Sequence, residues 1–159
     1  MVERRLRIEA DPVLVSVDGA KIERIVENLL ANTARHTDPD TPIWVWVRAH
    51  DGGVLIVVED AGRGVPAELR ETIFRPFEQG PERSAHSPGV GIGLSLVGRF
   101  AKLHGGRAWV EDRPGGGASF RVWLPDGPPG GVGAPGAAGH PGQRRAAGPE
   151  EPPARAASA

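Results

Sequence analysis

The two asparagines of the chain, Asn28 and Asn32, lie four residues apart in a segment whose apolar spacing predicts a helix. At about 100° per residue, both amides share a helix face with Arg35 and His36, away from the apolar side. Magnesium prefers oxygen ligands and usually keeps water molecules and substrate phosphates around it. This face could therefore bind a magnesium ion and phosphate oxygens. The pattern taken alone leaves an ordinary solvated helix face as the alternative.

A carboxylate, Asp60, follows the most apolar segment of the chain, residues 54–58. Gly62 and Gly64 come directly after it. A carboxylate in this position can accept a hydrogen bond from an exocyclic amine, and glycines let a flat ring approach the backbone. The same pattern also fits a strand that simply ends in a tight turn.

Three glycines at a spacing of two, Gly89, Gly91 and Gly93, precede Leu94 at the start of a predicted helix. Consecutive backbone N–H groups at a helix N-terminus suit phosphate oxygens. The glycines follow a long polar segment, so they differ from the dinucleotide-binding pattern, which follows a strand. The sequence also lacks the P-loop motif.

Periodic apolar residues predict the elements that must position these groups. Asp18 is expected to cap the first helix, and the strands near the N-terminus are each expected to have one buried face. Strands are predicted at residues 6–8, 13–17, 43–48, 54–58, 107–111 and 119–124, and helices at residues 18–35, 66–74 and 93–104. This order favours a two-layer α/β sandwich, in which helices cover one face of a mixed β-sheet.

The composition divides the chain into two parts. Residues 1–125 contain every Trp and Phe and have a normal length for one domain. In residues 126–159, Gly, Pro and Ala supply 24 of the 34 residues. Such a segment cannot bury enough apolar surface to offset its ordering entropy. We therefore expect one domain followed by a disordered tail.

Charge and residue usage exclude several classes of protein. The chain has 19 Lys and Arg against 20 Asp and Glu, so there is no basic stripe for nucleic acid. It has no Cys, which excludes disulfide scaffolds and thiolate metal sites. Its apolar runs are far too short to insert into a membrane, and no signal peptide opens it. We expect a cytoplasmic location, with a membrane anchor possible in a longer parent protein.

The candidate motifs also occur in a distinctive order. The sequence resembles the catalytic and ATP-binding domain of sensor histidine kinases, within the GHKL ATPase and kinase superfamily. The resemblance covers residues 1–125 and rests on five motifs: an N box at residues 28–37, a G1 box at 60–64, an F box at 74–77, a G2 box at 89–94 and a looser G3 box at 115–120.

This resemblance implies ATP and Mg²⁺ as cofactors. Asn32 corresponds to the magnesium ligand and Asn28 to the second amide near it. Arg35 takes the position of the basic residue that meets the ATP phosphates, and His36 that of its aromatic or imidazole neighbour. Asn28 and Arg35, together with Arg83, are the candidate catalytic residues.

The remaining implied residues form the nucleotide pocket. Asp60 corresponds to the carboxylate that reads the adenine amino group. Arg83 lies in a predicted mobile lid, residues 78–88, where it would reach the γ-phosphate or remain solvated. Ala118 stands where a hydroxyl residue is common, and the neighbouring Ser119 is the candidate to supply that hydroxyl. The implied cofactor-binding set also contains Gly62, Gly64, Gly89, Gly91, Gly93, Leu94 and Ser119.

Asn28 distinguishes between branches of the superfamily. DNA gyrase, the mismatch-repair ATPases and the heat-shock chaperones resemble one another in having a glutamate there, which activates water. An amide cannot take a proton from water or serine at neutral pH, and Glu27 is rotated about 100° away. A histidine nitrogen needs no strong base. The resemblance therefore implies transfer of the γ-phosphoryl of Mg·ATP to histidine.

The acceptor is expected on another segment, because none of the five histidines lies in a helical HExxTP-like context. The implied partners are a histidine-containing dimerisation domain, in the same chain or another, and a downstream response regulator. Two alternatives remain at this stage: a serine kinase of the anti-sigma type, and a non-catalytic module that binds a nucleotide or a protein partner.

Overall fold

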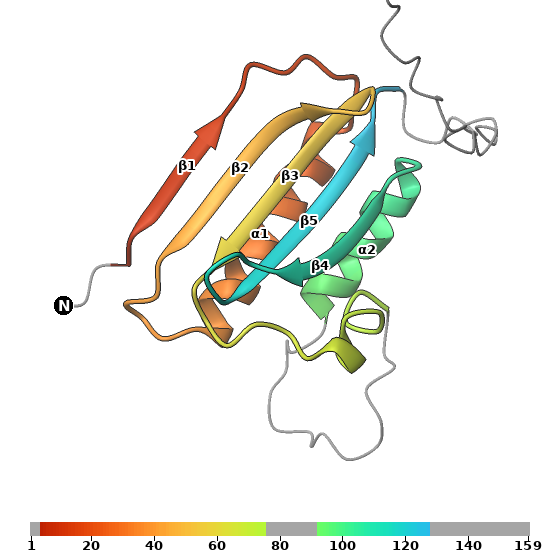
Figure 1. The fold of residues 1–159 in the computed structure, drawn as a ribbon. Helices are drawn as coiled ribbons and strands as arrows, with labels where there is room; N and C mark the ends of the chain where they lie inside the picture. The colour runs from red at the N-terminus through yellow and green to blue at the C-terminus, as the bar shows by residue number, and fades with distance from the viewer. Residues whose placement is uncertain (1–3, 76–91, 128–159) are drawn as a thin grey trace, which may run out of the picture.

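The computed structural model describes residues 4–75 and 92–127, which form a five-stranded sheet with two α-helices on one face (Figure 1). The strand order is β1-β2-β3-β5-β4, with β1 parallel to β2 and the other neighbours antiparallel. The elements are β1 (Leu6–Ala10), α1 (Gly19–His36), β2 (Ile43–His50), β3 (Gly53–Asp60), the 3₁₀ helix η1 (Ala67–Leu69), α2 (Ile92–Leu103), β4 (Arg107–Asp112) and β5 (Ala118–Pro125). The predicted two-layer α/β sandwich is confirmed.

The core lies between the sheet and the two α-helices. Alternate residues of the central strand β3, including Ile56 and Val58, face the helix layer, as the period of two requires. Ile25 and Leu29 of α1 and Val97 of α2 are fully buried against them. This packing places the C-terminal end of α1 next to the C-terminal end of β3 (Figure 1).

Asp18 caps α1 as predicted. Its carboxylate accepts a hydrogen bond from the backbone N–H of Lys21, and the Lys21 ammonium also pairs with it. Its backbone N–H donates to Nε2 of the buried His104 at 3.3 Å, while Nδ1 of His104 lies 2.8 Å from the carbonyl oxygen of Phe100. These bonds assign the Nδ1–H tautomer to His104. They tie the start of α1 to the end of α2.

The structure corrects the predicted strand at residues 13–17. Val13 and Val15 do pack against the core, so the alternation is real, but no strand forms. The backbone N–H of Ser16 donates to Asp126 Oδ1, and its carbonyl accepts from Gly127 N–H. Because the polar backbone groups of Ser16 bond to residues just after β5, the segment runs along the edge of the core without joining a strand ladder.

Two further predictions need correction. β1 forms, but Ile8 is 62 % exposed, because β1 is an edge strand beyond the area that the helices cover. The predicted helix at residues 66–74 is reduced to η1 and a series of turns. Arg70 anchors these turns by donating to the carbonyl of Val65 and to Asp112 Oδ1.

Of the tail predicted at residues 126–159, only Asp126 and Gly127 are described, and both bond to Ser16. The rest of that tail and the predicted lid at residues 78–88 lie outside the described residues. No helix within residues 4–75 or 92–127 is long and apolar enough to cross a membrane.

We predict that Leu29→Ala lowers the free energy of unfolding by about 2–5 kcal/mol, because Leu29 is 0 % exposed and truncation leaves a cavity. Leu103→Ala is the matched control, since Leu103 lies in the other helix and is 48 % exposed; its cost should stay below about 1 kcal/mol. Urea denaturation measures both values. Equal losses would contradict the described core.

A second prediction concerns pH. Hydrogen bonds from the Lys21 side chain and backbone N–H hold the pKa of Asp18 below its usual range. The Asp18 carboxylate therefore stabilises the folded state above its unfolded-state pKa, and this contribution is lost as pH falls through the lower folded-state pKa. Asp18→Asn keeps the cap but removes this titration. The urea midpoint of the variant should consequently fall less between pH 5 and pH 2 than that of the wild type.

Candidate functional site

A cavity of about 220 Å³ lies between the second half of α1 and the start of α2. Its walls bring together both asparagines and Arg35 with the first residues of α2. The lining residues are Asn28, Ala31, Asn32, Arg35, Ile92, Gly93 and Leu94. The shared helix face predicted for Asn28, Asn32 and Arg35 is thus the wall of a cavity, and not only a solvated surface.

The amide of Asn28 has a defined orientation in this cavity. Its Nδ2 donates to the carbonyl of Arg24 at 2.7 Å, so its Oδ1 is directed towards α2. A Cβ atom at position 93 would lie 2.9 Å from this oxygen. Glycine at position 93 therefore permits the close approach of α2 to the Asn28 oxygen.

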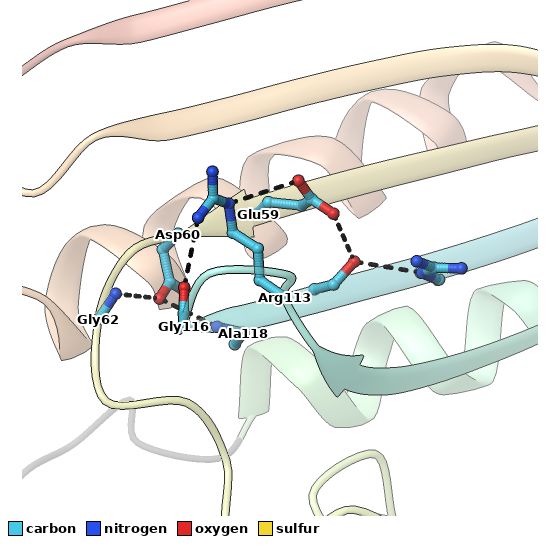
Figure 2. A network of polar contacts seen from close by, with 8 residues as sticks. Glu59, Asp60, Gly62, Arg113, Gly116 and Ala118 are labelled. Atoms are coloured by element: carbon cyan, nitrogen blue, oxygen red, sulfur yellow. Dashed lines mark hydrogen bonds and ion pairs between the residues drawn. The ribbon is translucent and has the colours of Figure 1, made fainter.

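Asp60 ends β3 on the helix side of the sheet and is only 4 % exposed. Its Oδ1 accepts the backbone N–H of Gly62 at 2.8 Å and that of Ala118 at 3.4 Å (Figure 2). Burial of a carboxylate is costly unless hydrogen bonds compensate it. Two main-chain donors on one oxygen also set where the second oxygen lies. The carboxylate is thereby held in one orientation.

The turn between β4 and β5 packs directly against Asp60. Gly117 has a φ of 107°, and a Cβ there would lie 1.8 Å from the carbonyl oxygen of Asp60. No side chain fits at that distance. The close approach brings the N–H of Ala118 within reach of the Asp60 carboxylate.

Two residues that the sequence reasoning did not single out, Thr37 and Arg4, hold the end of α1 against the turn after Asp60. The methyl group of Thr37 would be 2.8 Å from a Cβ at Gly62, and the Thr37 hydroxyl donates to the carbonyl of Thr33. Arg4 caps the end of α1 through the Thr37 hydroxyl at 2.7 Å and three nearby carbonyls. The only sequence signal for these contacts was the series of polar residues at the end of the helix, because the partners of Arg4 lie thirty or more residues away along the chain.

The hydroxyl of Thr33, one helical turn before Thr37, lacks a hydrogen bond within the described residues. It is buried, and its Oγ1 has no hydrogen-bond partner in the part of the chain that the structure describes. A buried hydroxyl without a partner is costly, and a bound polar group or water molecule would relieve that cost. Thr33 lies one turn before Thr37, which packs on the turn after Asp60.

Some predicted residues lie elsewhere. His36 is exposed at the end of α1 and does not line the cavity. Ser119 is fully buried, but it pairs with Glu59 on the face opposite Asp60, and its hydroxyl donates to the Glu59 carboxylate. Ser119 therefore lies away from the cavity and from Asp60, and its predicted role in cofactor binding stays a prediction. Gly64 lies in the turn after Asp60, whereas Arg83, Gly89 and Gly91 lie outside the described residues.

The donor set suits a magnesium nucleotide better than a metal ion alone. No cluster of three or more acidic, His or Cys side chains occurs in residues 4–75 and 92–127. Amide oxygens beside a guanidinium instead suit an ion that brings its own phosphate ligands. A larger hollow of about 410 Å³ beside β4 contains none of the predicted site residues. The chemistry therefore favours the smaller cavity.

Substitutions in the β4–β5 turn test the contact with Asp60. Gly116 and Gly117 both have positive φ, but a Cβ at Gly116 meets nothing within 4 Å. Gly116→Ala should cost about 1–3 kcal/mol of backbone strain. Gly117→Ala should cost a further ~1–3 kcal/mol, because the Asp60 backbone must move. Urea unfolding of the two variants gives the difference, and equal costs would contradict the described contact.

Comparisons with known proteins agree with this geometry. The sensor protein KinB of Pseudomonas aeruginosa, which acts in alginate biosynthesis, is 40% identical over 111 residues, covering 70% of this chain and 18% of the relative. The sensor histidine kinase TmoS of Ectopseudomonas mendocina is 42% identical over 127 residues, covering 76% of this chain and 13% of the relative. The chain thus spans less than a fifth of the length of these two relatives.

Solved structures are also similar to this chain. The nucleotide-free catalytic domain of histidine kinase ThkA matches with a TM-score of 0.67 and 28% identity, over 79% of this chain and 82% of that chain. Full-length ShkA in complex with AMPPNP matches with a TM-score of 0.64 and 27% identity, over 79% of this chain and 26% of that chain.

The family model described as histidine kinase-, DNA gyrase B- and HSP90-like ATPase matches residues 17–128. That range contains α1, the cavity, Asp60 and the β4–β5 turn. The chain therefore belongs to the family of histidine kinase-, DNA gyrase B- and HSP90-like ATPases.

Proposed function

We propose that this chain is the ATP-binding catalytic domain of a sensor histidine kinase, which transfers the γ-phosphoryl of Mg·ATP to a histidine on a dimerisation domain. The observation that carries the proposal is the cavity in which Asn28, Asn32 and Arg35 face the start of α2. Relatives named as histidine kinases support it. The dimerisation domain would belong to a longer parent or to another chain.

In this proposal Asp60 accepts a hydrogen bond from the adenine amino group. Its burial favours this role, because a hydrogen bond to a charged acceptor in a site that excludes water discriminates strongly between ligands. Gly62 and Gly64 shape the pocket around the ring, and the hydroxyl of Thr33 offers a further polar group to the ligand or to a bridging water molecule.

The phosphates and the metal ion would occupy the other end of the site. Asn32 would hold Mg²⁺, which supplies charge neutralisation on the transferring phosphoryl group. Arg35 would meet phosphate oxygens, and Asn28 would present the amide oxygen that its bond to Arg24 orients. Gly93 and Leu94 would place the start of α2 against the phosphates.

The predicted roles of the residues outside this geometry remain proposals. Arg83, Gly89 and Gly91 would belong to a lid that closes over the nucleotide, and His36 would reach it from the end of α1. Lid closure in such enzymes excludes water from the reacting groups.

The absence of a carboxylate base at position 28 favours phosphorylation of histidine over hydrolysis. Asn28 cannot take a proton, whereas a histidine nitrogen is already nucleophilic. The neighbouring Glu27 is exposed and pairs with Arg24 at 3.1 Å, and it does not line the cavity. Neither residue is placed to activate water or a serine hydroxyl.

A response regulator would receive the phosphoryl group from the dimerisation domain. This module would act in the cytoplasm, and its parent protein could be anchored in a membrane. Nucleic acid is not among the proposed partners.

Ligand binding is tested first by thermal unfolding. Mg·ATP at about 100 times its dissociation constant should raise Tm by roughly 8–15 °C. Asp60→Asn and Asn32→Ala should reduce this shift, whereas Asp40→Asn, a change at an exposed residue after α1, should leave it intact. Mg·GTP should give no comparable shift. An unchanged Tm at millimolar Mg·ATP would refute nucleotide binding.

Phosphoryl transfer is tested with γ-labelled ATP and a histidine-containing dimerisation domain from a sensor histidine kinase. Acid-labile, base-stable label on the supplied domain is the expected product. Nucleotide binding without transfer to any such domain would instead favour a non-catalytic module, and label on a serine would favour the anti-sigma type of kinase.

A further inference from the structure

The face of the sheet opposite the helices carries a polar network directly behind Asp60 (Figure 2). Glu59 and Asp60 are consecutive in β3, so their side chains point to opposite faces of the sheet. Asp60 faces the helix layer, and Glu59 faces away from it. Residues that contact Glu59 therefore affect the same end of β3 as Asp60, but from the opposite face of the sheet.

Glu59 has two partners from the β4–β5 region. Its Oε1 accepts the hydroxyl of Ser119 at 2.9 Å, and the Ser119 oxygen accepts Nε of Arg121 at 3.2 Å. Its Oε2 lies 3.6 Å from Nε of Arg113. The Arg113 and Glu59 side chains are only 21 % and 15 % exposed, so this ion pair is less screened by solvent than a surface pair.

Arg113 also holds the glycine turn. Its Nη1 donates to the carbonyl of Gly116 at 3.4 Å, and its guanidinium carbon lies 3.9 Å above the ring of Trp44. Its backbone N–H donates to the carbonyl of Gly117, and its carbonyl accepts the N–H of Gly116, both at 3.0 Å. One residue thus links the turn to both β2 and β3.

The same turn contacts Asp60 on the other side. Gly117 packs on the Asp60 carbonyl, and the next N–H, that of Ala118, donates to Asp60 Oδ1. At 3.4 Å this hydrogen bond is near the upper limit of length, so a small movement of the turn would break it. Gly62 alone would then hold the oxygen, and the carboxylate could rotate.

We propose that Arg113, acting with Glu59, is a positioning residue for the Asp60 carboxylate and thereby sets the preference of the site for a 6-aminopurine. This inference rests on the proposed function, in which Asp60 accepts a hydrogen bond from the adenine amino group. Arg113 fixes the turn from the open face of the sheet, and Ala118 transmits that placement to Asp60.

The structure also offers a matched control. Arg107 lies at the other end of β4, roughly 17 Å along the strand, and stacks on Trp109 with its guanidinium carbon 4.5 Å from the ring centre. Arg107→Met removes the same kind of stack and the same charge as Arg113→Met. It leaves the glycine turn untouched.

The experiment compares Kd values for ATP and for purine riboside triphosphate, which lacks the 6-amino group, in the presence of Mg²⁺. The wild type and Arg107→Met should both prefer ATP. Arg113→Met should lose about tenfold of that preference, the size expected when a hydrogen bond to a charged group is weakened. Its Kd for purine riboside triphosphate should change less than threefold, because the phosphate end of the site is unaffected.

Other results would overturn the proposal. An unchanged preference in Arg113→Met would refute positioning while leaving the proposed function intact. An equal loss of affinity for both nucleotides would mean that Arg113 only stabilises the domain. A wild type that binds neither nucleotide would refute the proposed function itself, and the positioning role with it.

A second variant keeps the test valid if Arg113→Met does not fold. Glu59→Gln preserves the shape of the side chain and its bond to Ser119, but removes the charge that pairs with Arg113. The preference for ATP should fall about threefold, with Tm in the absence of nucleotide confirming a folded domain. A preference equal to that of the wild type would overturn the proposal.

Discussion

Asp60 is a carboxylate buried at the end of the central strand, and much of the surrounding structure serves to make that burial possible. A buried carboxylate needs donors, and this one receives two backbone N–H groups on one oxygen. One donor comes from the turn after β3 and the other from the start of β5, so two loops must meet there. The glycine turn allows that meeting, because Gly117 lies against the Asp60 main chain.

α1 serves both the core and the site through its helical period. Ile25, Leu29 and Thr33 recur every four residues and are buried against the sheet, whereas Asn28 and Asn32 recur on a neighbouring face and line the cavity. The axial position of the helix is set at both ends, by His104 at the start and by Arg4 at the end. Packing that stabilises the fold thus also places the amides relative to α2.

The two faces of the sheet differ in character. The helix face is apolar apart from Asp60 and Asp112 at the strand ends, while the open face carries all four tryptophans and several arginines. Arginines stack on three of these rings and cover their apolar surface. Around Glu59, Arg113 also links the β4–β5 turn to β3. The open face of the sheet thus contributes to the geometry around Asp60 on the helix face.

Local pattern was sufficient for much of this protein. The apolar runs at residues 43–48 and 54–58, the helical period and Asp18 cap of α1, and the glycines before the last strand all act between near neighbours, so they predicted the elements and the fold class. The spacing of Asn28, Asn32 and Arg35 likewise predicted a shared face. These features depend on short-range geometry, which the order of residues already contains.

Tertiary structure decided what depends on distant partners. Residues 13–17 have the alternation of a strand, yet they form none, because their polar groups bond to residues beyond β5. The exposure of β1 follows from where the helices end, and the side of the sheet that Ser119 faces follows from its register with Glu59. Arg4, Thr37 and Arg113 gain their roles from groups tens of residues away. The sequence by itself determined the elements and the residue types of the site, whereas only the packing of those elements decided which polar groups meet there.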